Sequence, residues 1–219
     1  MFVLAIDTSS PAVTAGVVTF GSDVTPAAVR APIAARGHGE LLAPAIAECL
    51  AEAGIGARDI VAVVAGTGPG PFTGLRVGLV TAAAFADSIG VRTYGVCSLD
   101  AIGAACADEP VLLVAADARR REVYWARYHH GARQGDLRVD HPVDVPLEGL
   151  TAVAGAAGEL YADSWPGLTV RAERYPDPAD LVRLARARIE AGGPGEPLTP
   201  LYLRRPDAVV PGAPKTVSQ

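Results

Sequence analysis

The segment AGTGPGPFTGLRVG, which spans residues 65–78, has the glycine content of a loop that binds phosphate. A Walker-type phosphate loop continues after its second glycine with Lys and then Ser or Thr. Here Gly74 is followed by Leu75 and Arg76, so the lysine that reaches the phosphates is missing. The segment does not match the loop of a nucleoside triphosphatase.

A dinucleotide-binding turn is excluded by the same kind of comparison. That fingerprint carries glycines at offsets zero, two and five, and the two glycine pairs of the segment have Pro71 and Thr73 at the third place. Pro69 and Pro71 fix the backbone, while the glycines beside them permit unusual dihedral angles. We predict a rigid strand-to-helix turn with Thr73 as the helix cap; an anion bound at the helix N-terminus is the alternative.

Two further segments place an aspartate at the end of an apolar run. LAIDTSSPAVTAGVV (residues 4–18) and VAADARRREVYWARY (residues 114–128) align with Asp7 opposite Asp117. A polar turn and a second apolar run follow each aspartate. The pattern predicts an internal duplication of one strand–turn–strand unit.

The second of these turns carries three consecutive arginines, Arg119, Arg120 and Arg121. Arginine side chains bind phosphate readily, but their bulk opposes the close approach of backbone to phosphate that glycine allows. The sequence leaves two interpretations open: a solvated basic turn, or a contact with an anion or RNA.

The cysteines and histidines lack the pattern of a metal site. Cys49, Cys97 and Cys106 have no CxxC spacing and are expected to be buried free thiols. His129 and His130 are adjacent on a predicted strand, where neighbouring side chains point to opposite faces. We therefore expect no metal and no cofactor.

The composition limits the class of protein. The chain has 219 residues, half of them apolar, with a formal net charge of −5 and an isoelectric point of about 5.4. Such an acidic chain lacks the basic field of a stand-alone nucleic-acid-binding protein. No apolar run reaches about 18 residues and no leader precedes the first strand-like run, so we expect a cytoplasmic protein without a membrane segment.

The hydrophobic pattern predicts alternating strands and helices. The first helix places Leu41 and Leu42 on its apolar stripe, with Pro44 in its first turn and Gly54 as its C-cap. The expected strands are 2–6, 12–20, 27–34, 60–66 and 92–98, and the expected helices are 38–54, 72–89 and 179–191. We expect an N-terminal α/β lobe over residues 1–98, a smaller, truncated α/β lobe over residues 99–205, and a flexible tail over residues 206–219.

Five motifs of this chain resemble those of one bacterial family. AIDTSS, GTGPGPFTGLRVGL, VCSLDAI, DARRREVYWA and PLYLRR are similar to motifs of the TsaB family, and together they extend from residue 2 to about residue 206. TsaB proteins are non-catalytic paralogues of TsaD, the subunit that forms threonylcarbamoyladenosine in tRNA. The resemblance implies the duplicated α/β lobes of the actin, Hsp70 and sugar-kinase superfamily, whose paired aspartate turns hold ATP.

The resemblance also implies that catalytic features of the paralogue are lost. TsaD carries a His-x-x-x-His metal site where this chain has Ser98 and Ile102, and Asp100 alone keeps an acidic group there. Isoleucine has no donor atom for a metal, and the lone His38 is expected to lie at the surface or at a helix start.

The nucleotide site is expected to be reduced in the same way. The resemblance assigns Asp7, Thr8 and Ser9 to a vestigial phosphate turn, which makes them the candidate cofactor-binding residues. The second turn of the superfamily uses glycines where this chain has arginines.

The helix after the glycine segment predicts a partner-binding face. Gly74, Gly78, Ala82 and Ala86 recur every four residues, and such a face lets another backbone approach closely. Packing against the chain's own sheet is the alternative. TsaB-like proteins pair through their first two helices, so the candidate interface residues are Leu41, Leu42, Leu75, Gly78, Leu79 and Ala82.

We therefore expect an accessory, non-catalytic subunit that binds and activates a TsaD-like threonylcarbamoyl transferase. The resemblance implies a TsaE-like ATPase as a further partner, a homodimer when the chain is alone, and contact with tRNA only through the complex. A stand-alone ATPase or small-molecule kinase of the superfamily is the alternative. A zinc metalloprotease is not supported, because the chain has no HExxH motif.

Overall fold

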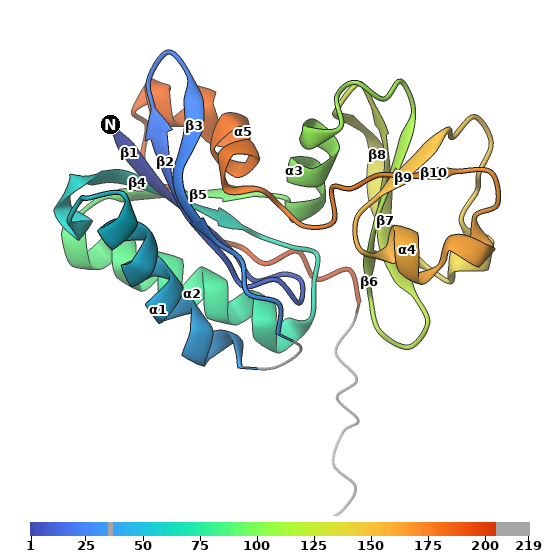
Figure 1. The fold of residues 1–219 in the computed structure, drawn as a ribbon, viewed down its shortest axis with the longest axis horizontal. Coiled ribbons are helices and arrows are strands. Elements are labelled where there is room, and N and C mark those ends of the chain that lie inside the picture. The colour runs from blue at the N-terminus through green and yellow to red at the C-terminus, as the bar shows by residue number, and fades with distance from the viewer. Residues whose placement is uncertain (35–36, 205–219) are drawn as a thin grey trace, which may run out of the picture.

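The computed structural model describes residues 1–34 and 37–204, which form two α/β lobes that lie side by side (Figure 1). Each lobe is built around one five-stranded sheet. The tail predicted over residues 206–219 lies outside the described residues.

The first sheet combines an antiparallel meander with two parallel strands. The meander is β1 (Phe2–Asp7), β2 (Thr14–Phe20) and β3 (Val24–Arg30). β4 (Ile60–Gly66) and β5 (Arg92–Val96) run parallel to β1, and the sheet has the order β3-β2-β1-β4-β5. β1 and β4 are apolar on both faces, the pattern of strands in a sheet that is covered on both sides.

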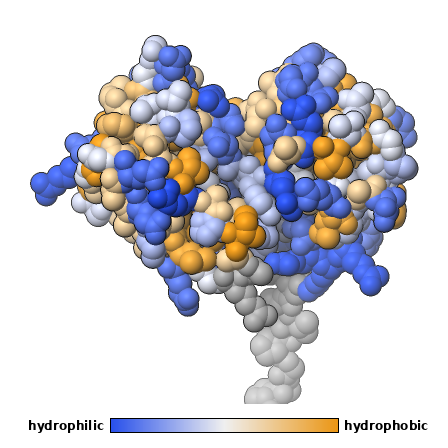
Figure 2. All heavy atoms as spheres, in the orientation of Figure 1, coloured by the Kyte–Doolittle hydropathy of each residue, from blue (hydrophilic) through white to orange (hydrophobic). Residues whose placement is uncertain are grey.

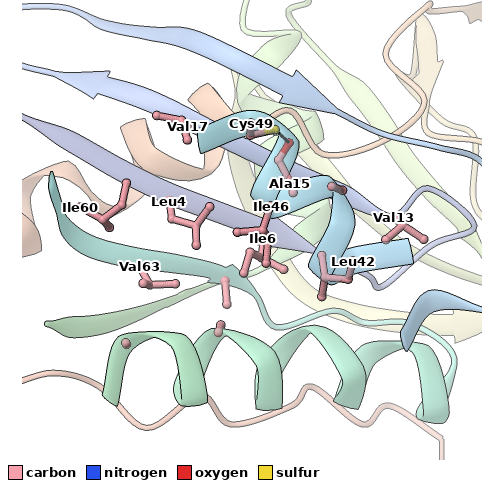
Figure 3. Close-up of a cluster of buried hydrophobic side chains, with 14 of the residues drawn as sticks. Leu4, Ile6, Val13, Ala15, Val17, Leu42, Ile46, Cys49, Ile60 and Val63 are labelled. Carbon is pink, nitrogen blue, oxygen red and sulfur yellow. Dashed lines mark hydrogen bonds between the residues drawn. The ribbon is translucent and has the colours of Figure 1, made fainter. Parts of the chain in front are cut away.

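Two long helices cover one face of this sheet. α1 (His38–Glu52) and α2 (Phe72–Ile89) enclose a core with side chains from β1, β2 and β4. Leu42 of α1 packs there with Leu4 and Ile6 of β1 (Figure 3). The predicted bounds of α2 are confirmed. By length and composition α2 would also be able to cross a membrane, but its buried stripe forms part of this core.

The opposite face of the first sheet is covered by α5 (Pro178–Ala191), which lies far along the chain. Ala179, Leu181 and Val182 of this helix are buried against β1, β2 and β5. The structure thus corrects the predicted division at residue 98, which assigned this helix to the second lobe by its place in the sequence. Its apolar stripe fits the sheet face that α1 and α2 leave uncovered.

The second sheet repeats the strand arrangement of the first. β6 (Leu112–Asp117), β7 (Val123–His129) and β8 (Ala132–Asp140) form the meander, and β9 (Ala152–Ala154) and β10 (Thr169–Val170) add parallel strands beside β6. The order β10-β9-β6-β7-β8 matches that of the first sheet, read from the other end. The only helix in its parallel part is the single turn α4 (Ala157–Leu160), as far as the described residues show. The predicted duplication, with a reduced second copy, is confirmed.

A short helix, α3 (Ser98–Ala105), connects the two cores. Ala101 packs into the core under α5, whereas Leu99 and Ile102 belong to the core of the second sheet. Three 3-10 turns complete the described elements, at Ala57–Asp59, Pro142–Asp144 and Ala162–Ser164.

Two helix starts differ from the predictions. α1 begins six residues before Pro44, so this proline lies in the second turn of the helix. Proline has no N–H to donate to the carbonyl four residues before it, and because Pro44 is exposed, that carbonyl stays accessible to water. α2 is preceded by Pro71 as its N-cap, and Thr73 is already helical. At the other end of α1, Gly54 follows the last cap residue with φ 68°, the conformation expected of a C-terminal glycine.

Candidate functional site

The aspartate that ends β1 is surrounded by hydrogen-bond donors of the chain itself. The Asp7 carboxylate accepts hydrogen bonds from the Ser9 N–H (2.9 Å), the Ser9 hydroxyl (2.7 Å) and the Ser98 hydroxyl (2.5 Å). The Ser98 oxygen in turn accepts from the Gly68 N–H. Burial raises the pKa of Asp7 above its ordinary value, against the opposing effect of these hydrogen bonds. Asp7 therefore joins the end of β1 to the glycine segment and to α3.

The next residue of this turn is bonded to α2. The Thr8 hydroxyl donates to the Gly74 carbonyl (2.7 Å) and accepts from the Gly78 N–H (2.9 Å). A Cβ atom added at Gly78 would overlap the Thr8 hydroxyl oxygen. The face of small residues on α2 therefore packs on the turn after β1.

The glycine segment is held against the same turn. A Cβ atom at Gly66 would overlap the Asp7 carboxylate, and one at Gly70 would overlap the backbone of Ser9. Gly68 has φ 90°, and its carbonyl accepts a hydrogen bond from the Ser98 N–H (2.8 Å). The glycines are thus required by close packing within the chain, and the predicted strand-to-helix turn is confirmed.

Most of the predicted interface residues lie inside the first lobe. Leu42, Leu75, Gly78, Leu79 and Ala82 are buried, and Leu41 is half-buried against the same core. For the five buried residues, the structure corrects the prediction that they meet a partner, whereas for the half-buried Leu41 it stays a prediction. A spacing of small residues does not distinguish packing on the chain's own elements from packing on another chain.

A different face of α2 is exposed to solvent. Phe72 and Val80 are 48% and 67% exposed, and with Arg76 and Thr81 they line a shallow hollow. The Arg76 guanidinium lies 3.7 Å from the Phe72 ring centroid and donates a hydrogen bond to the Tyr202 hydroxyl (2.6 Å). Phe72, Arg76 and Val80 also recur at four-residue spacing, a signal that the sequence contained and that the small-residue pattern obscured.

The two aspartate turns lie on one cavity between the lobes. Ser9 and Ser10 of the first turn, with Asp117 and Arg119 of the second, line a space of about 200 Å³. Its remaining walls are mainly proline and aliphatic side chains. Figure 2 shows a hollow between the two lobes on the viewed face. The facing arrangement of the turns agrees with the duplicated fold, although their side chains differ from those of a phosphate cradle.

The second turn has an unusual backbone. Arg119, Arg120 and Arg121 have φ values of 63°, 55° and 62°. The Arg119 N–H donates to the Asp117 carboxylate (3.0 Å), and the Glu122 N–H donates to the Arg119 carbonyl (3.0 Å). These two N–H groups are therefore engaged within the turn.

The residues at the paralogue's metal positions have other partners. Ile102 is part of the second core, and Asp100 accepts a hydrogen bond from Tyr128 (2.7 Å) and pairs with Arg133 (3.0 Å). His38 Nε2 lies 2.9 Å from the Ser10 carbonyl oxygen. Within residues 1–34 and 37–204, no three His, Cys, Asp or Glu side chains are grouped in a way that would hold a metal ion.

The histidine pair differs from the prediction. The His129 and His130 rings contact edge to face, with centroids 4.7 Å apart, because His130 leaves the strand with φ 46°. Cys49 and Cys106 are buried free thiols, as predicted, whereas Cys97 is half-buried. Burial raises the pKa of Cys97 and of Cys106 to about 12, so neither thiol forms a thiolate readily at neutral pH.

In sequence, this chain matches tRNA-modification proteins. Residues 28–164 match the family model described as TsaD: tRNA N6-adenosine threonylcarbamoyltransferase. An uncharacterized protein of Mycobacterium tuberculosis is 47% identical over 206 residues, which cover 94% of this chain and 93% of that protein. The tRNA threonylcarbamoyladenosine biosynthesis protein TsaB of Escherichia coli is 34% identical over 131 residues, which cover 58% of this chain and 55% of that protein.

The fold gives the same assignment. YeaZ from Pseudomonas aeruginosa superposes with a TM-score of 0.77 and 26% sequence identity, covering 92% of this chain and 99% of that one. This similarity includes both lobes. The chain therefore belongs to the TsaD family, and within it to the TsaB group.

Proposed function

We propose that this chain is an accessory, non-catalytic subunit that binds and activates a TsaD-like threonylcarbamoyl transferase. Its similarity to TsaB and YeaZ supports a role in the biosynthesis of threonylcarbamoyladenosine in tRNA. One observation carries the non-catalytic part: the Asp7 carboxylate is hydrogen-bonded to Ser9 and Ser98, and the Thr8 hydroxyl is hydrogen-bonded to the backbone of α2. The turn that binds phosphate in the superfamily serves packing here.

The exposed face of α2 is the proposed contact with this partner. It offers Phe72 and Val80 as apolar side chains, and the Arg76 stack holds Phe72 in place. α1 packs beside α2 and exposes the small residues Ala43 and Ala47. Removing such apolar surface from water stabilises a complex by roughly 25 cal/mol per Å².

The remaining parts of the assembly follow from the same assignment. The isolated chain forms a homodimer, a TsaE-like ATPase docks on the pair with the TsaD-like subunit, and tRNA is bound within that cytoplasmic complex. A stand-alone ATPase or kinase needs groups of the β1 turn to be free for phosphate. ATP turnover by the isolated chain that is lost in Asp7→Asn would favour that alternative.

The partner face is tested by substituting Val80 with arginine. Because Val80 is 67% exposed, Val80→Arg keeps the fold, but it places a charge in the contact and abolishes co-purification with the TsaD-like protein. Leu184→Arg is the matched control: Leu184 is also exposed and lies on α5, on the opposite side of the same sheet.

The readouts are circular dichroism, co-purification and tRNA modification by the reconstituted complex. A folded Val80→Arg chain that no longer binds or activates the partner, beside a normal Leu184→Arg chain, supports the proposal. Normal binding by Val80→Arg contradicts the assignment of this face. Full modification activity of the TsaD-like protein in the absence of this chain contradicts the accessory role.

A further inference from the structure

The turn between β6 and β7 keeps arginine where the backbone favours glycine. Arg119, Arg120 and Arg121 all have positive φ, and the Ala118 N–H donates to the Glu122 carbonyl (2.9 Å) to close the hairpin. The left-handed backbone conformation matches the twist of a tight hairpin, and the positions that adopt it are ordinarily occupied by asparagine or glycine. Each arginine there costs stability that glycine would avoid. Such outliers are a reason to look for a function.

The turn concentrates arginines in a chain whose formal net charge is −5. The Arg119 side chain is 57% exposed, and its guanidinium lies 3.7 Å from the Asp117 carboxylate. Two neighbouring arginines are paired, Arg174 with Glu159 and Arg204 with Glu122. Arg119, Arg120 and Arg121 are all exposed, and Arg174 and Arg204 lie close to them. The turn therefore gathers several guanidinium groups at one exposed place.

The form of the site favours a polyanion over a free nucleotide. The arginine side chains stand on an exposed hairpin, and N–H groups of the turn are engaged within it. The adjacent cavity of about 200 Å³ is lined largely by proline and aliphatic side chains. Guanidinium groups on an exposed turn suit the phosphates of a nucleic-acid backbone, which are bound without regard to base sequence.

We infer that the arginine turn 119–121 binds phosphate groups of the RNA backbone. This inference rests on the proposed function, because the assembled complex supplies the RNA as its tRNA substrate. The chain's negative net charge opposes RNA binding elsewhere, so the turn adds a contact to tRNA that the complex already holds.

The test uses variants that remove charge and relieve the strained backbone together. Arg119→Gly with Arg121→Gly should raise the thermal midpoint of the chain, because glycine adopts positive φ freely. The same change should weaken tRNA binding by the complex about tenfold at moderate salt and lower the salt slope by roughly 1 to 2. Arg119→Lys with Arg121→Lys keeps the charge and should retain most of the affinity.

A matched control removes two exposed arginines at a distance. Arg58 and Arg92 lie just before β4 and at the start of β5, at the opposite end of these strands from the aspartate turns. Arg58→Gln with Arg92→Gln should leave the affinity for tRNA and its salt slope unchanged. Fluorescence anisotropy with labelled tRNA over a salt series measures both quantities, and calorimetry with ATP tests the free nucleotide.

The outcomes separate this inference from the proposed function. A wild-type complex that binds and modifies tRNA, with a glycine variant of equal affinity, overturns the inference and leaves the proposed function intact. Loss of the TsaD-like partner in the glycine variant assigns the turn to a protein contact, and arginine-dependent ATP binding assigns it to a free nucleotide; either result overturns it. If the wild-type chain forms no complex with the TsaD-like protein and no tRNA is modified, both the inference and the proposed function are overturned.

Discussion

Asp7 is a carboxylate whose surroundings favour its neutral form. Burial raises its pKa above the ordinary value of 3.8, so the folded chain holds a proton there more tightly than the unfolded chain does. The stability that this group contributes is fully present below that ordinary value and is lost as pH rises through the raised pKa. Ionisation of Asp7 in the folded chain buries a charge that the hydrogen bonds from Ser9 and Ser98 only partly compensate.

The Asp7→Asn variant should have a different pH dependence from the wild type. Its amide oxygen can still accept from Ser9, and no charge is buried as pH rises. The free energy of unfolding of Asp7→Asn minus that of the wild type should therefore increase as pH rises above the ordinary value of 3.8. Urea denaturation at several pH values measures this difference. Parallel curves for the two proteins would contradict the assignment of a raised pKa to Asp7.

The residues of this site were only partly predictable from the sequence. An aspartate after an apolar strand and a glycine-rich connection are local patterns, and both lie where they were expected. The Thr8 hydroxyl, in contrast, is hydrogen-bonded to the backbone of α2. This contact joins residues about 70 positions apart in the sequence. Such a contact depends on the tertiary arrangement, which periodicity alone does not contain.

At the scale of elements, α2 shows how one helix is constrained on two sides. Its predicted bounds are confirmed because its apolar period, the proline before it and Gly90 after it agree with one another. The sequence pattern did not distinguish its buried face from its exposed face, because residues of both faces recur at four-residue spacing. Gly74 and Gly78 point to the β1 turn, whereas Phe72 and Val80 face solvent.

The packing of α2 predicts the effect of a single methyl group. Gly78→Ala should destabilise the chain by roughly 1–3 kcal/mol, although alanine is the better helix former by about 1 kcal/mol. The reason is the overlap of the new Cβ atom with the Thr8 hydroxyl. Gly39→Ala is the control, because Gly39 in α1 has open space around it, and it should leave stability unchanged or raise it.

A double-mutant cycle locates the clash. Thr8→Ala removes the oxygen that the alanine at position 78 would meet, so the pair Thr8→Ala and Gly78→Ala should cost less than the sum of the two single changes. Additive losses would mean that Gly78 is not in contact with Thr8. The larger Gly78→Arg should unfold the chain, a result that differs from the loss of partner binding alone.

At the scale of the whole molecule, the duplication was visible but the division of elements between lobes was not. Two aligned aspartate turns indicated two related sheets, and both sheets have the same strand order. The sequence could not show that the chain returns from the second lobe to place α5 on the first sheet. A helix's apolar stripe indicates that it must be covered, not which sheet covers it.

The whole assembly provides a last prediction about the proposed partner face. If the isolated chain dimerises through the exposed face of α2 and the TsaD-like subunit uses the same face, the two contacts exclude each other. Adding the TsaD-like protein should then convert homodimers into heteromers that lack the homodimer contact, and Val80→Arg should weaken both associations. Raising the concentration of this chain should reduce its apparent affinity for the partner, because more of it is dimeric. Light scattering after gel filtration at several concentrations measures these species, and a homodimer that binds the partner without dissociating would rule out a shared face.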